Sequence, residues 1–334
     1  MAPKRILIIR LSALGDVAMT LPAIYSLARQ NPTLEVTVLT SEKFCKLFLE
    51  CPENLRLVPY SKERHGGFKG WLRLLGELRR YRFQQVADMH NVMRSWLIDA
   101  FFLIQGVRVA MVPKRRKERR RILMDKQSAE PFIQRYFKVL QRLGHEVKPD
   151  FPGFFFESPQ IADGPLSARK RIGIAPFARY MNKTYPIEQM RQVVRLLDDS
   201  GQFDIYLFGG GKRETDIFTA WRAESKHIAY ASGSLSLGEE LALMHGLDAM
   251  VSMDSANMHL AALTGVRVIS IWGSTTPACG FLGWQQRTDD ALYADVPCQP
   301  CTISGSPVCQ RGDLLCFLHI TPEQIVEKIC QIVK

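Results

Sequence analysis

A single carboxylate, Asp16, lies in an otherwise neutral turn within the stretch LSALGDVAMTLPAI, residues 11–24. The apolar run before it predicts a buried strand, and the residues after it have the spacing of a helix. A carboxylate held in such a turn can act as a general base toward a hydroxyl group. It can equally serve as the N-cap of the next helix, which would stabilise that helix by about 1 kcal/mol. The spacing by itself leaves both interpretations open.

The stretch DSANMH, residues 254–259, suits a bound anion. Asp254 and Ser255 end an apolar run that predicts a strand, and a helix is expected to begin directly after them. The first N–H groups of that helix lack partners within it, and its dipole presents positive charge there. His259 falls in the first or second turn, where it could point toward a diphosphate. The alternative is that Ser255 only caps the helix and that His259 only packs.

Two further loops carry residues that fit a phosphate group. The hydroxyl-rich turn of SIWGSTTP brings Ser274 and Thr275 after another predicted strand. The loop ARYMNKTYP, residues 178–186, follows the first predicted strand of the second half and holds Lys183. A lysine at that place can neutralise the charge of a leaving diphosphate. The alternative is an ordinary surface lysine.

The net charge is concentrated in a few stretches. KRRKERRR, residues 114–121, contains seven of the basic residues. Such a cluster attracts anionic partners, which include phosphorylated substrates, membrane surfaces and nucleic acids. The alternative is a solvated basic loop.

Four of the eight cysteines are clustered in the order Cys298, Cys301, Cys309 and Cys316. Four thiolates can close a tetrahedral zinc site. Because the cluster contains only one C-x-x-C pair, we expect reduced structural thiols and keep structural zinc as the alternative. No catalytic metal is expected.

Buried strands and helices alternate in both halves of the chain. Apolar, β-branched runs predict strands at 5–11, 35–41, 84–90, 171–177, 203–211, 249–255 and 266–274. This alternation indicates parallel sheets with helices on both faces. A proline-rich stretch around 145–168 predicts a linker. We therefore expect two doubly wound α/β domains, whose ligands bind at the carboxyl ends of the strands.

Length and composition narrow the class of protein. The 334 residues, 46% of them hydrophobic, carry a formal net charge of +11 and can form two domains with their own cores. No apolar segment approaches the roughly 20 residues that cross a bilayer. The apolar run at the amino terminus is too short for a signal peptide. We therefore expect a cytoplasmic protein, in which a disulfide framework is not expected.

Together, these stretches resemble glycosyltransferase family 9, the ADP-heptose:lipopolysaccharide heptosyltransferases and their relatives. The resemblance rests on ILIIRLSALGDVAMTLPAI, the lysine of NKTYP, the glycine-rich strand end with Glu214, and MDSANMHLAALTGVRVISIWGSTTP. It implies a GT-B fold, with two Rossmann-like domains facing a central cleft, and an inverting mechanism. It implies an acceptor domain at 1–160, a nucleotide-sugar domain at 161–320, and a last helix at 321–334 that packs back on the first domain.

The resemblance also implies roles for residues on the donor side. Asp16 would be the general base, Lys183 would contact the donor phosphates, and Glu214 would contact the nucleoside ribose. The remaining donor-binding residues would be Asp254, Ser255, Ala256, His259, Ser274 and Thr275. The family commonly has glycine where this chain has Ala256, and the added methyl narrows the approach of a ligand to the backbone.

DMHNVMRS, residues 88–95, resembles the acceptor side of the family. With the basic run it would hold an anionic glycolipid through Asp88, His90, Asn91, Arg94, Arg115, Arg116, Arg119 and Arg120. His90 or a second carboxylate remains an alternative base. The basic run would also attract the anionic inner leaflet of a membrane, where each charge adds about 1 kcal/mol.

These features predict an inverting glycosyltransferase that moves a sugar, by resemblance a heptose, from an ADP-sugar to a lipopolysaccharide core or related glycolipid. The nucleotide-sugar is a co-substrate, no further cofactor is expected, and the enzyme would lie on the cytoplasmic face of the inner membrane. One alternative is a nucleotide-sugar 2-epimerase of GT-B fold. Another is a nucleic-acid-binding protein built on residues 114–121. That run contains no aromatic residue, so a nucleic-acid partner is not expected.

Overall fold

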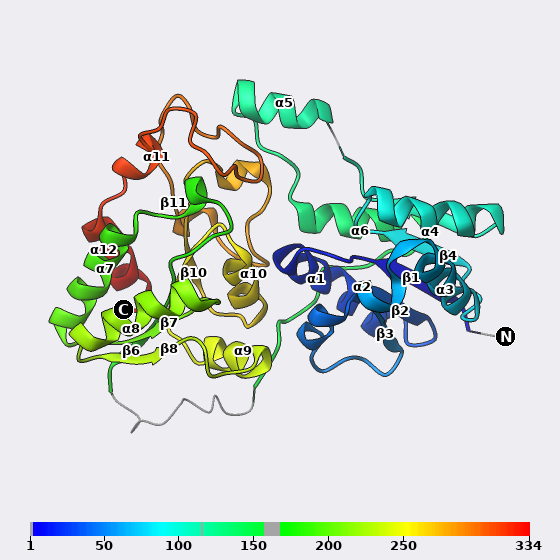
Figure 1. Cartoon of the computed structure of the whole chain (residues 1–334), viewed down its shortest axis with the longest axis horizontal. Helices are drawn as coiled ribbons and strands as arrows, with labels where there is room; N and C mark the ends of the chain where they lie inside the picture. The colour runs from blue at the N-terminus through cyan, green and yellow to red at the C-terminus, as the bar shows by residue number, and fades with distance from the viewer. Residues whose placement is uncertain (1–2, 115, 157–167) are drawn as a thin grey trace. The chain divides into compact units, whose positions relative to one another are not determined.

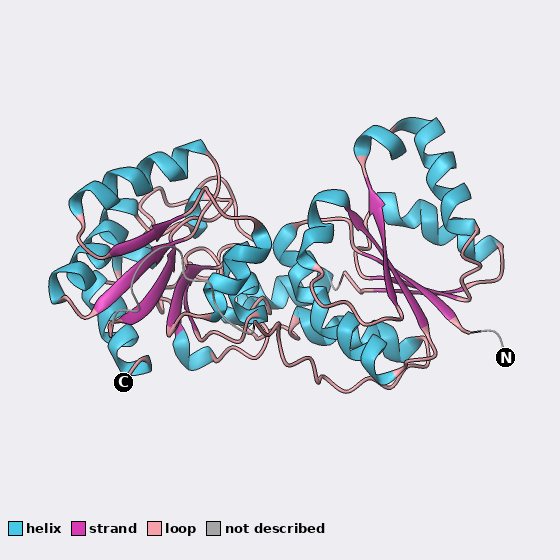
Figure 2. Cartoon of the chain, turned by 90° about the horizontal axis from the view of Figure 1, so that it is seen from below, coloured by secondary structure: helices cyan, strands magenta, loops and turns pink. Residues whose placement is uncertain are grey.

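The computed structural model describes residues 3–114, 116–156 and 168–334, which form two compact units (Figure 1). The first unit comprises Met1–Arg115 and Phe132–Pro152, and the second comprises Arg116–Pro131 and Gly153–Lys334. Each unit is a parallel sheet with helices packed against it (Figure 2). The sequence predicted this α/β class.

The sheet of the first unit has five parallel strands in the order β3-β2-β1-β4-β5. The strands are β1 (Arg5–Ile9), β2 (Glu35–Ser41), β3 (Leu55–Tyr60), β4 (Gln85–Asp88) and β5 (Arg108–Met111). β1 is at the centre, and its residues 6–9 are wholly buried. A continuous apolar run is therefore required there, because both faces of a parallel sheet are covered.

The helices of the first unit pack on its sheet and on one another. They are α1 (Leu14–Gln30), η1 (Glu42–Leu47), α2 (Lys62–His65), α3 (Gly67–Arg79), α4 (Met93–Ile104) and α6 (Phe132–Arg142). α1 packs against α6. α3 and α4 share one core cluster with Leu7 and Ile9 of β1.

The second unit contains a six-stranded parallel sheet in the order β11-β10-β9-β6-β7-β8. Its strands are β6 (Lys170–Ala175), β7 (Phe203–Leu207), β8 (Ile228–Ala231), β9 (Ala249–Met253), β10 (Val268–Ile271) and β11 (Ala291–Leu292). Its longer helices are α5 (Arg116–Asp125), α7 (Ile187–Ser200), α8 (Lys212–Glu224), α9 (Leu237–His245), α10 (Ala256–Leu263) and α12 (Pro322–Ile332). Short helical turns are η2 (Met181–Lys183), η3 (Pro277–Cys279), η4 (Thr288–Asp290) and α11 (Leu315–Leu318).

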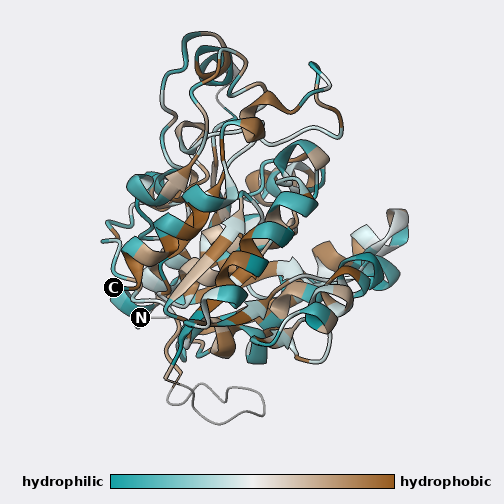
Figure 3. Cartoon of the chain, turned by 90° about the vertical axis from the view of Figure 1, so that its left-hand side faces the viewer, coloured by the Kyte–Doolittle hydropathy of each residue, from teal (hydrophilic) through white to brown (hydrophobic). Residues whose placement is uncertain are grey.

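Hydropathy follows this layering. The strands are mostly brown in Figure 3, and the outward surfaces of many helices are teal. None of the described helices combines the length and the apolar character needed to span a bilayer.

Two segments belong to a different unit from the one that the sequence analysis expected. The last helix, α12, packs against α7 rather than on the first unit, because Ile325 and Ile329 are buried in the core of the second unit. Residues 116–131 also belong to the second unit. Ile122 and Ala129 pack against Cys279, and the Ala129 N–H donates a hydrogen bond to the Ala278 carbonyl at 2.7 Å. The predicted boundary at 160–161 falls outside the described residues.

The strand orders mark where each sheet can bind a ligand. In the first unit the chain runs outward from β1 to β3 and then returns to β4 on the other side of β1. In the second unit it runs from β6 to β8 and returns to β9 beside β6. The loops after β1 and β4, and those after β6 and β9, therefore diverge at topological switch points, where open α/β sheets bind ligands.

Candidate active site

Asp16 lies in the first turn of α1, at the switch point of the first unit. Its Oδ2 atom accepts a hydrogen bond from the Ala13 N–H at 3.1 Å and forms an ion pair with Arg10 Nη2 at 2.8 Å. The N-cap of α1 is Ala13, and Asp16 is the third helical residue. The interpretation of Asp16 as the N-cap is therefore wrong. The turn is also not neutral, because a guanidinium lies beside the acid.

Arg10 holds this carboxylate from within the unit. Its side chain is largely buried, and Nη1 donates hydrogen bonds to the Met89 carbonyl at 2.7 Å and to the Tyr136 hydroxyl at 3.4 Å. These contacts fix the guanidinium, which in turn orients Asp16. One third of the Asp16 side chain, 33%, stays exposed, so a hydroxyl group can reach it from solvent.

His90 follows β4, the strand next to β1. Its Nε2 atom lies 3.4 Å from the Ser12 hydroxyl, so the two loops meet at the switch point. Burial lowers the pKa of His90 to about 4, and the charge of Arg10 contributes to the shift. His90 is therefore neutral at physiological pH and binds a proton weakly. Of the two candidate bases in this unit, we favour Asp16, whose carboxylate is partly exposed and oriented by Arg10.

Asp88 shapes the loop that carries His90. It is wholly buried, and its Oδ1 atom accepts hydrogen bonds from the N–H groups of His90 at 2.7 Å and Asn91 at 2.8 Å. Its Oδ2 atom accepts a hydrogen bond from the Ser95 hydroxyl at 2.7 Å. Asp88 thus joins the end of β4 to the start of α4, and both of its carboxylate oxygens accept hydrogen bonds from the protein itself.

A second acid, Asp99 of α4, is buried beside Asp88. Burial and the charge of Asp88 raise the pKa of Asp99 from 3.8 to about 8. The folded chain therefore keeps a proton on Asp99 that the unfolded chain has lost. Between the ordinary pKa of an aspartate and this raised pKa, the free energy of unfolding should therefore fall as pH rises.

Asp99→Asn should remove this dependence, because an amide has no proton to lose. We expect the variant to gain stability relative to the wild type steadily from pH 5 to pH 8, measured by urea unfolding. Asp125→Asn, at an exposed acid of α5, is the matched control and should show no such trend. Parallel stability curves for Asp99→Asn and the wild type would contradict the assignment.

The other predicted acceptor residues belong to different helices and loops. Asn91 accepts a hydrogen bond from Trp96 Nε1 at 2.7 Å and also donates one to the Val112 carbonyl. Arg94 is exposed at the start of α4. Arg119 and Arg120 are exposed on α5, which belongs to the second unit. Arg116 begins that helix, and Arg115 lies outside the described residues.

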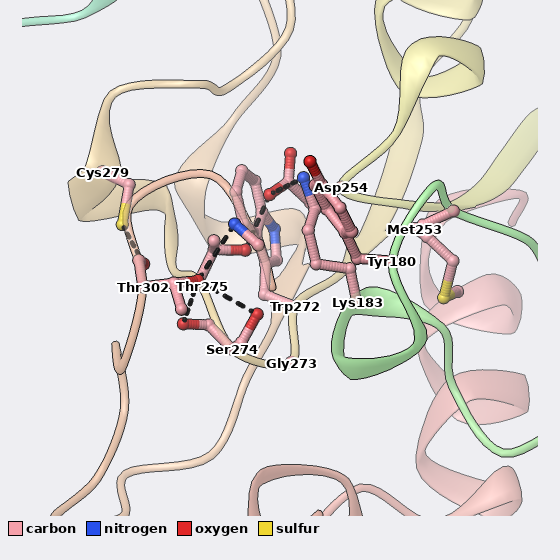
Figure 4. Close-up of polar contacts among 12 residues, drawn as sticks. Tyr180, Lys183, Met253, Asp254, Trp272, Gly273, Ser274, Thr275, Cys279 and Thr302 are labelled. Carbon is pink, nitrogen blue, oxygen red and sulfur yellow. Dashed lines mark hydrogen bonds and ion pairs between the residues drawn. The ribbon is translucent and has the colours of Figure 1, made fainter. Parts of the chain in front are cut away.

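Lys183 and Asp254 meet at the switch point of the second unit (Figure 4). Lys183 Nζ lies 2.8 Å from Asp254 Oδ2, and the Thr275 hydroxyl donates a hydrogen bond to the same oxygen at 2.6 Å. The side chains of Lys183 and Asp254 are only 13% and 5% exposed. An ammonium group has three protons, so Lys183 can bind Asp254 and still donate to an anion.

The loop that carries Lys183 packs closely against Gly305 and Ser306. Gly305 has φ +94°, and a Cβ on it would lie 2.5 Å from Lys183 Cδ and 2.6 Å from Tyr180 Cδ2. Only a glycine therefore lets this loop pass so close to the lysine stem. Asn182 accepts hydrogen bonds through its side chain from the Ser306 N–H and through its carbonyl from the Ser274 N–H.

The N-terminus of α10 lies directly after Asp254. Ser255 is the N-cap by position, but its side chain makes no capping hydrogen bond. Ala256 is the first helical residue, and His259 is buried one turn later. The first N–H groups of α10 have no intrahelical partners. They provide a neutral, positively polarised set of donors beside the Lys183 ammonium.

Comparison with known proteins identifies the chain. The family model of glycosyltransferase family 9 (heptosyltransferase) matches residues 71–308. The chain belongs to this family. The lipopolysaccharide heptosyltransferase 1 of Pseudomonas aeruginosa is 24% identical over 361 residues, covering 97% of this chain and 97% of that relative. The family predicted from the motifs is confirmed, and the chain is a glycosyltransferase.

Solved structures confirm the fold of this family 9 enzyme. The glycosyl transferase family 9 protein of Veillonella parvula has a TM-score of 0.78 at 19% identity, over 99% of this chain and 97% of that one. The ADP-heptose lipopolysaccharide heptosyltransferase II of Escherichia coli has a TM-score of 0.70 at 18% identity, over 98% of each chain. The predicted GT-B fold class is therefore confirmed.

Glu214 lies in the first turn of α8, after the glycine-rich end of β7. Its Oε2 atom accepts a hydrogen bond from the Gly210 N–H at 2.7 Å. A Cβ on Gly209 would lie 2.7 Å from the same oxygen. In this family 9 enzyme, Glu214 therefore holds the glycine turn with one oxygen. Contact with a ribose through its other oxygen stays a prediction.

Ser274 and Thr275 are almost wholly buried. The Ser274 hydroxyl accepts a hydrogen bond from the Thr302 hydroxyl at 3.3 Å, whereas Thr275 binds Asp254. In this glycosyltransferase the Thr275 hydroxyl thus supports the Asp254 carboxylate, whereas the Ser274 residue contacts the Lys183 loop through its backbone N–H, which donates to the Asn182 carbonyl. Direct donor binding by these two residues stays a prediction.

The four clustered cysteines line one small cavity beside Asn182 and Gly273. Among the residues that the structure describes, no three His, Cys, Asp or Glu side chains are placed to hold a metal ion. Burial, and then the neighbouring cysteines, raise the pKa of Cys316 to about 12, so this thiol stays protonated. Of the four, Cys316 is buried and the others are partly buried, and the choice between reduced structural thiols and structural zinc stays a prediction.

Sequence reasoning missed the residues that fix this enzyme's site. Arg10, Asp99 and Gly305 are in direct contact with predicted residues or beside them, and none of the three was singled out. Of these three residues, only Arg10 could have been identified from the sequence, because a cation at the end of an otherwise apolar strand needs a buried partner. No local pattern marks Asp99 or Gly305, since their partners are brought to them only by the fold.

Proposed function

We propose that the chain transfers a heptose from ADP-heptose to a sugar of a lipopolysaccharide core, with inversion at the anomeric carbon. Family membership supports the class of donor and acceptor. The observation that carries the proposal is the chemistry at the two switch points, a partly exposed carboxylate in the first unit and a lysine beside a helix N-terminus in the second.

In the proposed reaction Asp16 takes the proton from the acceptor hydroxyl as its oxygen attacks the anomeric carbon. A bond forms between that oxygen and the anomeric carbon, and the bond from this carbon to the diphosphate breaks. The departing ADP carries the negative charge. Lys183 and the first N–H groups of α10 stabilise that charge where it develops, which is the usual main source of such catalysis.

The anionic acceptor also suggests where the enzyme works. The exposed arginines of α5 and Arg94 would contact acidic or phosphorylated groups of a glycolipid. We propose peripheral association with the cytoplasmic face of the inner membrane, where such an acceptor is presented. The nucleotide-sugar serves as a co-substrate, and the proposed chemistry uses groups of this chain alone.

The test is an assay of purified protein with ADP-heptose, with and without a lipopolysaccharide precursor that ends in an acidic sugar. We expect ADP release that depends on the acceptor, and a product whose anomeric configuration is opposite to that of the donor. A donor that is epimerised without an acceptor would overturn the proposal in favour of a 2-epimerase. The proposal would also be overturned if neither a transfer product nor an epimerised donor forms at enzyme concentrations at which the donor is bound.

A further inference from the structure

Helix α4 exposes a row of apolar side chains that the proposed chemistry does not use. This apolar row consists of Met93, Trp96, Leu97, Leu103 and Ile104, with exposures from 42% to 88%. The opposite side of the helix packs on the core through Ile98 and Phe102, with Ser95 and Asp99 buried beside them. Large apolar side chains thus lie on both sides of α4, and the exposed ones form the kind of surface that is expected to have a partner.

A second helix of the first unit, α3, also exposes apolar side chains. α3 packs on the same core cluster as α4, through Leu74 and Leu78. Outward it exposes Phe68 and Leu72, at 80% and 55%. Large apolar side chains left exposed in such numbers mark a site of interaction with another protein, a ligand or a membrane.

Helices α3 and α4 carry exposed cations, and neither carries an exposed acid. Lys114 Nζ lies 4.1 Å from the centre of the Trp96 ring, and Arg94 is exposed at the start of α4. α3 adds three exposed cations, Lys69, Arg73 and Arg79. The only acid of α4, Asp99, is buried, and the only acid of α3, Glu77, is paired with Arg64 at 3.1 Å.

The start of α4 is linked to the candidate active site. The Trp96 indole donates its hydrogen bond to Asn91 at 2.7 Å, and Asn91 directly follows His90. Asp88 binds both the His90 N–H and the Ser95 hydroxyl. A partner that binds the apolar row would therefore lie near the loop that carries His90.

We propose that the apolar row of α4, together with Phe68 and Leu72 of α3, docks the first unit on an anionic lipid bilayer. The apolar side chains enter the boundary between headgroups and acyl chains, and the cations pair with headgroup phosphates. A second copy of the chain is disfavoured as the occupant, because two such surfaces would bring their cations together. The link to an acceptor in that bilayer rests on the proposed function, but the docking itself does not.

The test is co-sedimentation of the full chain with vesicles of phosphatidylglycerol and phosphatidylethanolamine, and with vesicles of phosphatidylcholine alone. We expect binding to the anionic vesicles and at least tenfold weaker binding to the neutral ones. Leu97→Ser with Ile104→Ser should weaken binding to the anionic vesicles at least tenfold. The matched control, Val308→Ser with Leu318→Ser, changes two exposed apolar residues of the second unit and should bind like the wild type.

Three outcomes would overturn the proposal. The first is wild-type binding that is absent or equal on both vesicles. The second is loss of binding with Arg119→Glu and Arg120→Glu but not with the α4 pair, which would assign docking to α5. The third is a dimer in analytical ultracentrifugation that the α4 pair dissociates, without any vesicle binding. Because no donor or acceptor is added, failure of sugar transfer would leave this result intact.

Discussion

Asp16→Asn should lower kcat for sugar transfer about 10²- to 10⁴-fold, the range that a positioned general base contributes. The amide cannot take the proton of the acceptor hydroxyl. Its oxygen can still accept the Ala13 N–H, as the carboxylate does at 3.1 Å, so the start of α1 should persist. The ion pair with Arg10 is lost, and we expect this to cost about 1 kcal/mol of stability because the site is partly exposed. The measurements are steady-state kinetics and urea unfolding.

A matched control is Glu188→Gln, which neutralises an exposed acid in the first turn of α7 and should leave kcat unchanged. His90→Gln separates the two candidate bases. It removes an imidazole that holds a proton only weakly, so its kcat should fall less than that of Asp16→Asn. If His90→Gln is the more damaging of the two, Asp16 is an orienting residue and the proposed base is wrong.

The fold could be predicted where a strand is buried on both faces. The stretches that form β1, β2, β4, β6, β7, β9 and β10 are mostly buried, and each was predicted. The edge strands β3 and β5 were not predicted, because LRLVPY and RVAM alternate buried and exposed residues. β8 and the two-residue β11 are the edge strands of the second sheet and were not predicted either. Edge strands carry weaker patterns because only part of their surface meets the core.

The helix α12 shows what an amphipathic pattern leaves open. Its sequence predicts the N-cap Thr321, which accepts the Gln324 N–H at 3.3 Å, and the buried stripe with Ile325. The pattern predicts that the stripe packs against an apolar surface, but it does not indicate which unit provides that surface. Chain order therefore could not decide between them, and the helix packs on α7.

The candidate site was predictable at its centre and not around it. Lys183 and Asp254 were both identified because they stand at strand ends with helix starts beside them. Their mutual ion pair was not predicted, since 70 residues of chain lie between positions 183 and 254 and no periodicity relates the two loops. The same holds for Arg10 and Tyr136, whose contact depends on the packing of α1 against α6.

Lys183→Met should lower kcat about 10²- to 10³-fold, as expected when one preorganised group that stabilises developing charge is removed. It should also destabilise the fold, because Asp254 is 5% exposed and would lose its cation. Breaking a buried pair on one side costs about 3–5 kcal/mol, and we expect the lower end because the Lys183 side chain is 13% exposed. The activity loss alone therefore does not show that Lys183 acts on the donor.

The double variant Lys183→Met with Asp254→Asn separates the two effects. Removing both charges leaves no uncompensated acid, and the Thr275 hydroxyl, 2.6 Å from Asp254 Oδ2, can still donate to the amide oxygen. We expect unfolding stability to return to within about 1 kcal/mol of the wild type, while kcat stays low. Asp254→Asn alone, which keeps the lysine, should retain more activity than the double variant. Recovery of both stability and kcat in the double variant would mean that Lys183 only neutralises Asp254, and the charge on the departing diphosphate would have to be stabilised by α10 without it.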